Sequence, residues 1–182
     1  SPNDGITFDD SAADRAWDAG DFDPSVGMVS ITDRLIHFCN QIVVRIKTKH
    51  PDQLFGVLAY VQYTRAPVGE KVDPNLIPEL APITYSRNHP MTDDGEPNNQ
   101  ALRNLVKGWG KAAPRMAYYL YQFNLSEVSS PYPMITKLSI DLPIIYKNHC
   151  AFWQPENLAN FDTSLHGLYL GNRMAWDPRQ DP

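Results

Sequence analysis

The segment Leu54–Pro67, LFGVLAYVQYTRAP, decides the fold that this sequence predicts. Its first half carries apolar side chains at consecutive positions, which is typical of a strand covered on both faces, as in a parallel sheet. Its second half brings tyrosines and a charge, and a proline ends it. Because ligands of α/β proteins bind beyond the carboxyl ends of the strands, this change predicts the mouth of a binding site. A core strand followed by ordinary surface tyrosines fits the segment equally well.

The composition predicts one globular domain and excludes two classes of partner. The chain has 182 residues, which is enough for a single domain over residues 1–182 with its own core. The formal charge is −5 and no basic block is present, so a nucleic-acid partner is not expected. No apolar run approaches the roughly 20 residues of a membrane span, so no membrane span is expected.

Motifs for cofactors and metals are missing from the sequence. Cys39 and Cys150 have neither CxxC nor HxxxH spacing around them, so we expect two buried thiols and no metal site. No glycine-rich phosphate loop follows a strand, which argues against a dinucleotide fold. No GxSxG elbow is present, which argues against an α/β-hydrolase. We therefore expect no cofactor.

Residues 1–29 contain seven aspartates among glycines and prolines, with weak apolar periodicity. We expect a long acidic loop with one helical turn near residues 12–17. Long loops in compact domains are usually functional or disordered, so this segment is expected to be an active-site loop. A calcium loop is a minor alternative, because the DxDxDG spacing and the closing glutamate are missing.

Residues 30–182 predict alternating helices and strands, the β/α repeats. The expected helices are residues 30–49 with a Ser30–Asp33 capping box, a helix starting at Asn98 or Asn99 and ending at Gly108 and Gly110, residues 131–148 with a second piece starting at Pro143 behind an Asp141 cap, and a helix starting at Thr163 or Ser164. The expected strands are the opening segment, Ile83–Ser86, Met116–Phe123 and Ala151–Gln154, with a proline-rich loop over residues 66–81.

This alternation predicts an α/β fold with a parallel sheet. Four strands are too few to close a barrel, which needs about eight. The chain is therefore expected to be either a small open α/β sheet or part of a (β/α) barrel whose first strands lie outside the given sequence.

Aromatic rings, amides and carboxylates collect where the expected strands end. Rings stack on the apolar face of a pyranose and amides bond its hydroxyls, so this mixture predicts a sugar site. Glycoside hydrolysis also needs two carboxyl groups beside the scissile bond. Glu156, two residues past an expected strand, and Asp4 are the candidates; a solvated loop acid and plain turn chemistry are the alternatives. Trp109 and Trp176 are expected in the core.

Five segments carry a resemblance to a known family. They are SPNDG (1–5), DRLIHFCNQIVVRIKTKHPDQ (33–53), GVLAYVQYTRAP (56–67), MAYYLYQFN (116–124) and YLGNRMAWDP (169–178). In this order they resemble a bacterial barrel family long listed only as a domain of unknown function. Some of its members are classed as endo-acting β-N-acetylglucosaminidases that cut complex N-glycans. The match spans nearly the whole chain, although each motif is short.

The resemblance implies a secreted or periplasmic glycoside hydrolase in which this chain supplies the C-terminal half of a TIM-type (β/α) barrel. SPNDG would then be the end of a barrel strand. In retaining hexosaminidases of this type, one carboxylate orients the substrate acetamide and another protonates the leaving oxygen. Asp4 and Glu156 are implied as this pair, with their two roles left open. Related sequences often carry cysteines in the following loop, where this chain has Phe8, Asp9 and Asp10.

The expected function is therefore glycan hydrolysis of the endo-β-N-acetylglucosaminidase type, with a second copy or a missing barrel half as partner. The expected substrate-binding residues are Asn3, Tyr60, Tyr63, Arg87, Tyr121 and Trp153. A non-catalytic carbohydrate-binding module and a structural α/β domain are the alternatives. Whether this chain alone is active stays open.

Overall fold

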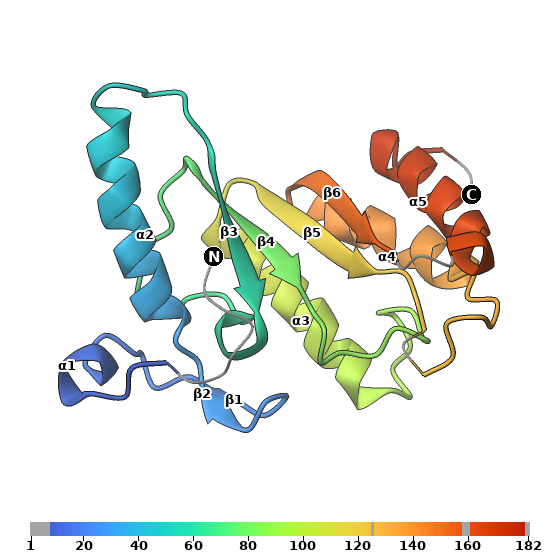
Figure 1. Ribbon diagram of the computed structural model, residues 1–182, viewed down its shortest axis with the longest axis horizontal. Coiled ribbons are helices and arrows are strands. Elements are labelled where there is room, and N and C mark those ends of the chain that lie inside the picture. Colours follow the sequence, from blue (N-terminus) through green and yellow to red (C-terminus); the bar gives the residue numbers. More distant parts are fainter. Residues whose placement is uncertain (1–7, 125, 158–160, 181–182) are drawn as a thin grey trace.

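The computed structural model describes residues 8–124, 126–157 and 161–180 (Figure 1). The helices are α1 (Ala12–Arg15), α2 (Thr32–Lys47), η1 (Val61–Tyr63), α3 (Pro97–Ala112), α4 (Ile135–Lys147), η2 (Phe161–Ser164) and α5 (Leu165–Trp176). The strands are β1 (Phe22–Asp23), β2 (Met28–Val29), β3 (Phe55–Tyr60), β4 (Leu76–Ala81), β5 (Met116–Tyr121) and β6 (Cys150–Glu156).

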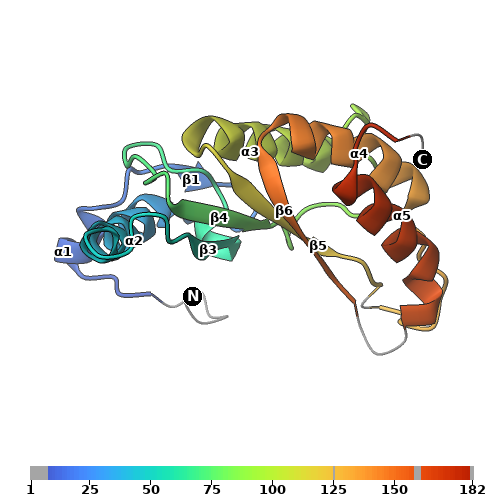
Figure 2. The same ribbon diagram turned by 90° about the horizontal axis from the view of Figure 1, so that it is seen from above.

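A four-stranded sheet in the order β3-β4-β5-β6 forms the centre of the molecule, and all its neighbouring strands are parallel. This confirms the expected α/β fold with a parallel sheet. The strand order never reverses along the chain, unlike that of a doubly wound sheet. Successive crossovers of one hand then place their helices on one face. Figure 2 shows α3 and α4 together on one side of the sheet.

That face of the sheet forms the main core. All four long helices contribute buried side chains to it, and Trp109 of α3 is 1% exposed there, as expected. The strand residues of this core alternate along the chain, as the pleat of a strand requires. Examples are Val57, Leu80, Met116 and Tyr118, packed with Ile36, Leu138 and Met174.

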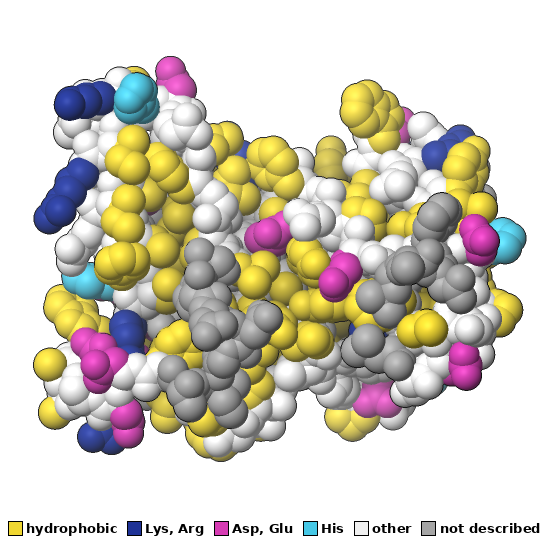
Figure 3. Space-filling model, viewed as in Figure 1, with side chains coloured by type: hydrophobic (Ala, Val, Ile, Leu, Met, Phe, Trp, Pro, Cys, Tyr) yellow, Lys and Arg dark blue, Asp and Glu magenta, His cyan; other side chains and the backbone are white. Residues whose placement is uncertain are grey.

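None of the helices in the described ranges contributes to the cluster on the opposite face of the sheet. This small cluster consists of Ala81, Tyr121 and Phe123 with Leu58, Tyr60, Ile83 and Tyr119 at its margin, all from strands or the segments after them. Figure 3 views this side and shows hydrophobic side chains over the middle of the molecule, with acidic side chains among them. We call it the open face. A half barrel and a small open sheet would both have such a face.

α2 begins differently from the expected helix. Its N-cap is Ile31, without a side-chain cap, so the Ser30–Asp33 capping box is wrong. The Asp33 carboxylate instead accepts backbone N–H groups of Val68, Gly69 and Glu70, at 3.0, 2.6 and 2.6 Å. The acid of the apparent box therefore holds the loop after β3 against the helix.

β4 lies in the segment that we expected to be a loop, and the expected strand Ile83–Ser86 is not a strand. Pro78 made the segment look like a loop, since proline cannot donate to a sheet ladder. The structure accommodates it because β5 pairs with β4 only at Glu79 and Leu80, beyond the proline.

Two expected helix breaks are also wrong. Gly108 and Gly110 lie inside α3. A Cβ at Gly110 would lie 2.8 Å from the Asn148 carbonyl oxygen, so this glycine permits close packing and does not end the helix. α4 runs without interruption through Pro143, and Asp141 binds elsewhere than at a cap.

The remaining corrections concern the ends of the chain. The expected helical turn in the N-terminal segment is confirmed as α1, but the segment also contains an antiparallel ribbon of β1 and β2. Trp176, expected in the core, is 91% exposed at the end of α5. Ser164 is the N-cap residue of α5, as expected, although its side chain makes no capping hydrogen bond to the described residues of the helix. None of the helices that the structure describes is long and apolar enough to cross a membrane.

Candidate functional site

The candidate site lies on the open face, near the carboxyl ends of the four parallel strands. Tyr60 is the last residue of β3, and Tyr121 and Glu156 are paired last residues of β5 and β6. Tyr119 lies one pleat below Tyr121, and Glu79 comes from the neighbouring β4. The strands converge there because parallel strands all end at the same edge.

Tyr119 interacts with two carboxylates. Its pKa is raised to about 12, first by burial, then by the charge of Glu156 and a hydrogen bond with it, and then by the charge of Glu79. Its ring centroid lies 5.2 Å from that of Tyr121. The phenol therefore stays protonated at neutral pH and can donate a hydrogen bond.

Glu79 is a site residue that the sequence reasoning missed. It occupies the open face of β4, and burial raises the pKa of its carboxyl group. A raised pKa favours the protonated form, which is what a proton donor requires. The available signal was a single acid within the apolar run LIPELA, but the expectation of a proline-rich loop removed it from consideration.

Arg87 lies beside the aromatic end of this face. Its Cζ atom is 5.6 Å from the ring centroid of Tyr121 and 5.9 Å from that of Phe123. Burial raises the pKa of Tyr121, the charges of Tyr60 and Glu156 raise it further, and the positive charge of Arg87 opposes them. The Arg87 guanidinium and the Glu156 carboxylate therefore both lie near the Tyr121 ring.

The backbone is strained where β3 leaves the sheet. Val61, directly after Tyr60, has φ 45°. A β-branched residue rarely adopts a positive φ, and such strain persists only where the surrounding structure enforces it. Strain of this kind clusters at functional sites, which favours this end of the sheet as the site.

The structure brings together some of the expected site residues. Tyr60, Arg87, Tyr121 and Glu156 gather at this end of the sheet. Glu156 is the last residue of β6 and does not lie beyond the strand as expected. Asn3 and Asp4 lie outside the described residues.

Two expected binding residues lie elsewhere. Trp153 lies on the helix-covered face, stacked on Tyr118 with ring centroids 6.1 Å apart, because it is three residues from Glu156 and a strand alternates its faces. Tyr63 is 1% exposed, with its ring edge against Phe8 at 5.7 Å between centroids. Neither side chain presents a surface to a ligand on the open face.

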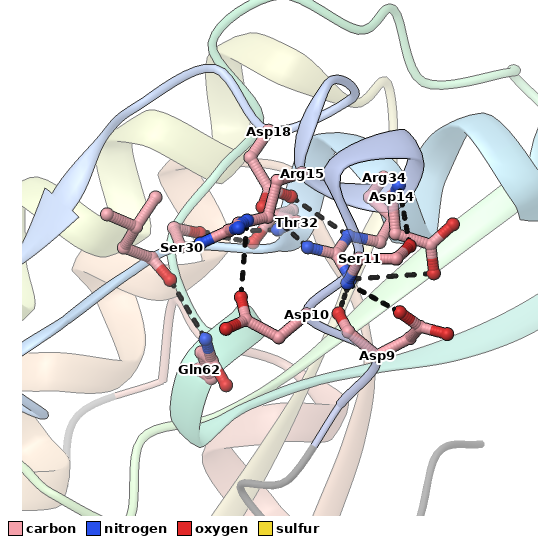
Figure 4. A network of polar contacts seen from close by, with 11 residues as sticks. Asp9, Asp10, Ser11, Asp14, Arg15, Asp18, Ser30, Thr32, Arg34 and Gln62 are labelled. Atoms are coloured by element: carbon pink, nitrogen blue, oxygen red, sulfur yellow. Dashed lines mark hydrogen bonds and ion pairs between the residues drawn. The ribbon is translucent and has the colours of Figure 1, made fainter.

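The acidic N-terminal segment is tied to the exit of β3 by polar contacts (Figure 4). Arg34 of α2 donates to both carboxylate oxygens of Asp18, at 3.0 and 2.6 Å, and to the Asp9 carbonyl oxygen. Gln62 of η1 donates to the Val29 carbonyl oxygen at 3.1 Å. Asp21, in the same segment, pairs with Arg65. These aspartates therefore have structural partners.

No group of three or more His, Cys, Asp or Glu side chains in the described ranges is arranged to hold a metal ion. The calcium alternative for the acidic segment thus gains no support from residues 8–29. The two cysteines are free, and burial raises the pKa of the Cys39 thiol and raises that of Cys150 to about 11. Raised values make both thiols poor nucleophiles.

Comparison with known proteins gives one match. Neither the curated proteins nor the solved structures contain a match to the chain. A family model described as Domain of unknown function (DUF4838) matches residues 9–182, which is nearly the whole chain. The protein therefore belongs to the DUF4838 family.

Proposed function

We propose that the open face binds a glycan and that the protein acts as a glycoside hydrolase of the endo-β-N-acetylglucosaminidase type. The observation that carries the proposal is that the charges of Glu79 and Glu156 both act on Tyr119, on a tyrosine-rich face near the carboxyl ends of parallel strands. Two carboxyl groups beside an aromatic surface are what acid-assisted cleavage of a sugar needs. The resemblance to a family with such members supports the same reaction.

The two described carboxyl groups suit different roles. Glu79 is the better proton donor, since burial raises its pKa. It would protonate the oxygen of the leaving sugar. Glu156, whose charge acts on Tyr119, would orient the substrate acetamide, whose oxygen attacks the anomeric carbon while the glycosidic bond breaks. Water then hydrolyses the cyclic intermediate. Asp4 keeps its expected catalytic role as a third carboxyl candidate.

Tyr60 and Tyr121 would form the floor on which the sugar ring stacks. They come from β3 and β5, so they span the width of the site from two strands. The proposed partner is thus a glycan, and secretion or a periplasmic location would bring the enzyme to it.

The experiment measures sugars released from a complex N-glycoprotein by mass spectrometry, using the natural full-length polypeptide. We expect Glu79→Gln and Glu156→Gln each to lower the rate about 10²- to 10⁴-fold, the usual contribution of general acid–base catalysis. Asp52→Asn, a change at an exposed carboxylate just before the amino end of β3 and so away from the carboxyl ends of the strands, is the matched control and should keep full activity.

The outcomes separate the proposal from its alternatives. Glycan binding without release, unchanged by Glu79→Gln and Glu156→Gln, would replace the hydrolase with a non-catalytic carbohydrate-binding module. Neither binding nor release would leave a structural α/β domain.

A further inference from the structure

Arg87 has a feature that neutral sugars do not explain. Its Nη1 atom is shielded from solvent, yet it donates no hydrogen bond to any residue in the described ranges. The neighbouring polar side chains do have partners: Asn88 accepts from the Tyr132 hydroxyl at 3.0 Å, and His89 pairs with Asp93 at 2.9 Å. The unsatisfied group is therefore the guanidinium itself and not the whole loop.

The surroundings of Arg87 hold the guanidinium in place without neutralising it. The rings of Tyr121 and Phe123 lie within 6 Å of its Cζ atom. Such stacking is favourable for a cation but leaves the N–H groups in the plane of the guanidinium free to donate. Glu156 acts on the same Tyr121 ring but forms no ion pair with Arg87. A shielded and unpaired N–H is costly, so native structures usually satisfy such groups.

From this arrangement we propose that Arg87 binds the carboxylate of an acidic sugar within the glycan. The inference rests on the proposed function and adds the class of substrate. A carboxylate matches the two parallel N–H groups of a guanidinium, and charge-assisted bonds of this kind are roughly twice as strong as neutral ones. Uronic acids and sialic acids both present this group, and a neutral hydroxyl would leave the charge uncompensated. The acidic sugar would lie beside Tyr121, close to Glu79 and Glu156.

Arg87 would act in binding and not in bond cleavage, because it places the acidic sugar relative to Glu79 and Glu156. Its loss should therefore raise KM for acidic glycans more than it lowers kcat. This split distinguishes a substrate-binding residue from a general loss of structure, which would lower kcat for all substrates together.

The test is calorimetric titration of the full-length protein with two matched pairs of oligosaccharides. One pair ends in glucuronic acid or its carboxyl-reduced form, and the other ends in sialic acid or its carboxyl-reduced form, so that each acid has a neutral counterpart. The wild type should bind one or both acidic forms at least about tenfold more tightly than the neutral ones, and this preference should shrink as salt is raised. The two acidic arms identify which acid the site takes.

Three variants test whether Arg87 is the source of the preference for acidic oligosaccharides. Arg87→Ala should lose about 10- to 100-fold in affinity for the acidic form and leave the neutral form within about threefold. Arg87→Lys keeps the charge but not the paired donors, so it should recover only part of that loss. Arg45→Ala is the matched control, since Arg45 is exposed on α2, and it should bind as the wild type does. Melting curves check that each variant is folded.

Equal binding of acidic and neutral forms, with Arg87→Ala unchanged, would overturn the inference and leave the proposed function standing. A preference for acid that survives Arg87→Ala would also overturn it. No binding of any saccharide would overturn the proposed function, and the inference with it.

Discussion

At the scale of single residues, a buried ion pair supports the loop that carries Arg87. Lys137 and Asp141 of α4 are both 4% exposed and lie 2.6 Å apart. Lys137 also donates to the His89 carbonyl oxygen at 2.8 Å, and Asp141 accepts the Met91 N–H at 2.7 Å. One turn of α4 therefore fixes the segment immediately after the guanidinium. Lysine and aspartate side chains often act in catalysis, but this pair supports the loop and so has a structural role.

Replacing one partner of this pair should destabilise the fold strongly. Lys137→Met leaves the Asp141 carboxylate buried without its cation, so the free energy of unfolding should fall by about 3–5 kcal/mol. The double change Lys137→Met with Asp141→Leu should be less destabilised than the single one, since no charge is left unpaired. Urea unfolding followed by circular dichroism measures both. A double variant weaker than Lys137→Met alone would show that the bonds to the loop matter more than the charge.

Glu79 should make stability depend on pH. Burial raises the pKa of the Glu79 carboxyl group in the folded state. The folded protein therefore binds the proton more tightly than the unfolded chain, in which a glutamate has a pKa of about 4.3. The resulting stabilisation is present below that pH and is lost as pH rises through the folded pKa. The difference in stability between Glu79→Gln and the wild type should therefore shift in favour of the variant from pH 4 toward pH 7. Thermal melts across this range, with Asp52→Asn as control, measure it; a pH-independent difference would be inconsistent with a raised pKa.

At the scale of elements, the site depends on how closely the last helix docks on the sheet. α5 packs on α4 and β6 through its small residues. A Cβ at Gly167 would lie 2.2 Å from the Pro133 carbonyl oxygen and 3.0 Å from Gln122 Nε2. A Cβ at Gly171 would likewise lie 3.3 Å from the Cζ2 atom of the Trp153 ring. Because these two positions carry no side chain, α5 can pack closely against the Pro133 backbone and the Trp153 ring of β6. This packing holds β6, and with it Glu156, in position.

Gly167→Ala should therefore lower stability by about 1–3 kcal/mol, because the added methyl group forces backbone to move. Gly108→Ala in α3 is the control: its Cβ would meet only the Ala66 side chain at 3.4 Å, and alanine favours a helix interior by about 0.5–1 kcal/mol. The control should be neutral or more stable. Thermal and urea unfolding of the two variants compare them. Equal stability of both would argue that α5 docks loosely.

At the scale of the whole molecule, the sheet has two outer strands, and apolar side chains are exposed beside each of them. Phe38 and Val44 of α2 lie next to the β3 side, 61% and 58% exposed. Phe152 of β6 and Trp176 after it are 48% and 91% exposed, and a groove of about 360 Å³ runs between them and α4. Unpaired outer strands with apolar flanks invite association.

We therefore expect residues 1–182, produced alone, to self-associate. The double variant Phe152→Lys with Trp176→Lys should shift the protein toward monomer, because two charges would have to be buried in any contact through β6. Lys107→Glu, a change at an exposed position of α3 away from both outer strands, should leave the oligomeric state unchanged. Light scattering across a concentration series reads the mass. A monodisperse wild-type monomer would contradict the expectation.

The sequence by itself determined the class of fold and named part of the candidate site. β3 and β5 show as apolar runs, and α2 and α3 as helical periodicity, because these patterns are local. The expectation that β3 is covered on both faces is wrong, since Val57 and Ala59 pack in the main core but Leu58 and Tyr60 lie on the open face.

The polar residues at the ends of such apolar runs led to Tyr60, Tyr121 and Glu156, which could be named without coordinates because parallel strands end at one edge. Arg87 was named from the expected strand Ile83–Ser86, which does not form.

Only the tertiary structure decided which neighbours each residue has. The single proline of β4 hid Glu79, since nothing local reveals that β5 pairs only beyond Pro78. The apparent cap at Asp33 became a clamp on a distant loop, and Trp153 turned to the helix-covered face. Strand pairing, register and the direction of a side chain arise from contacts between distant segments. A local pattern therefore predicts which elements form but not how they meet.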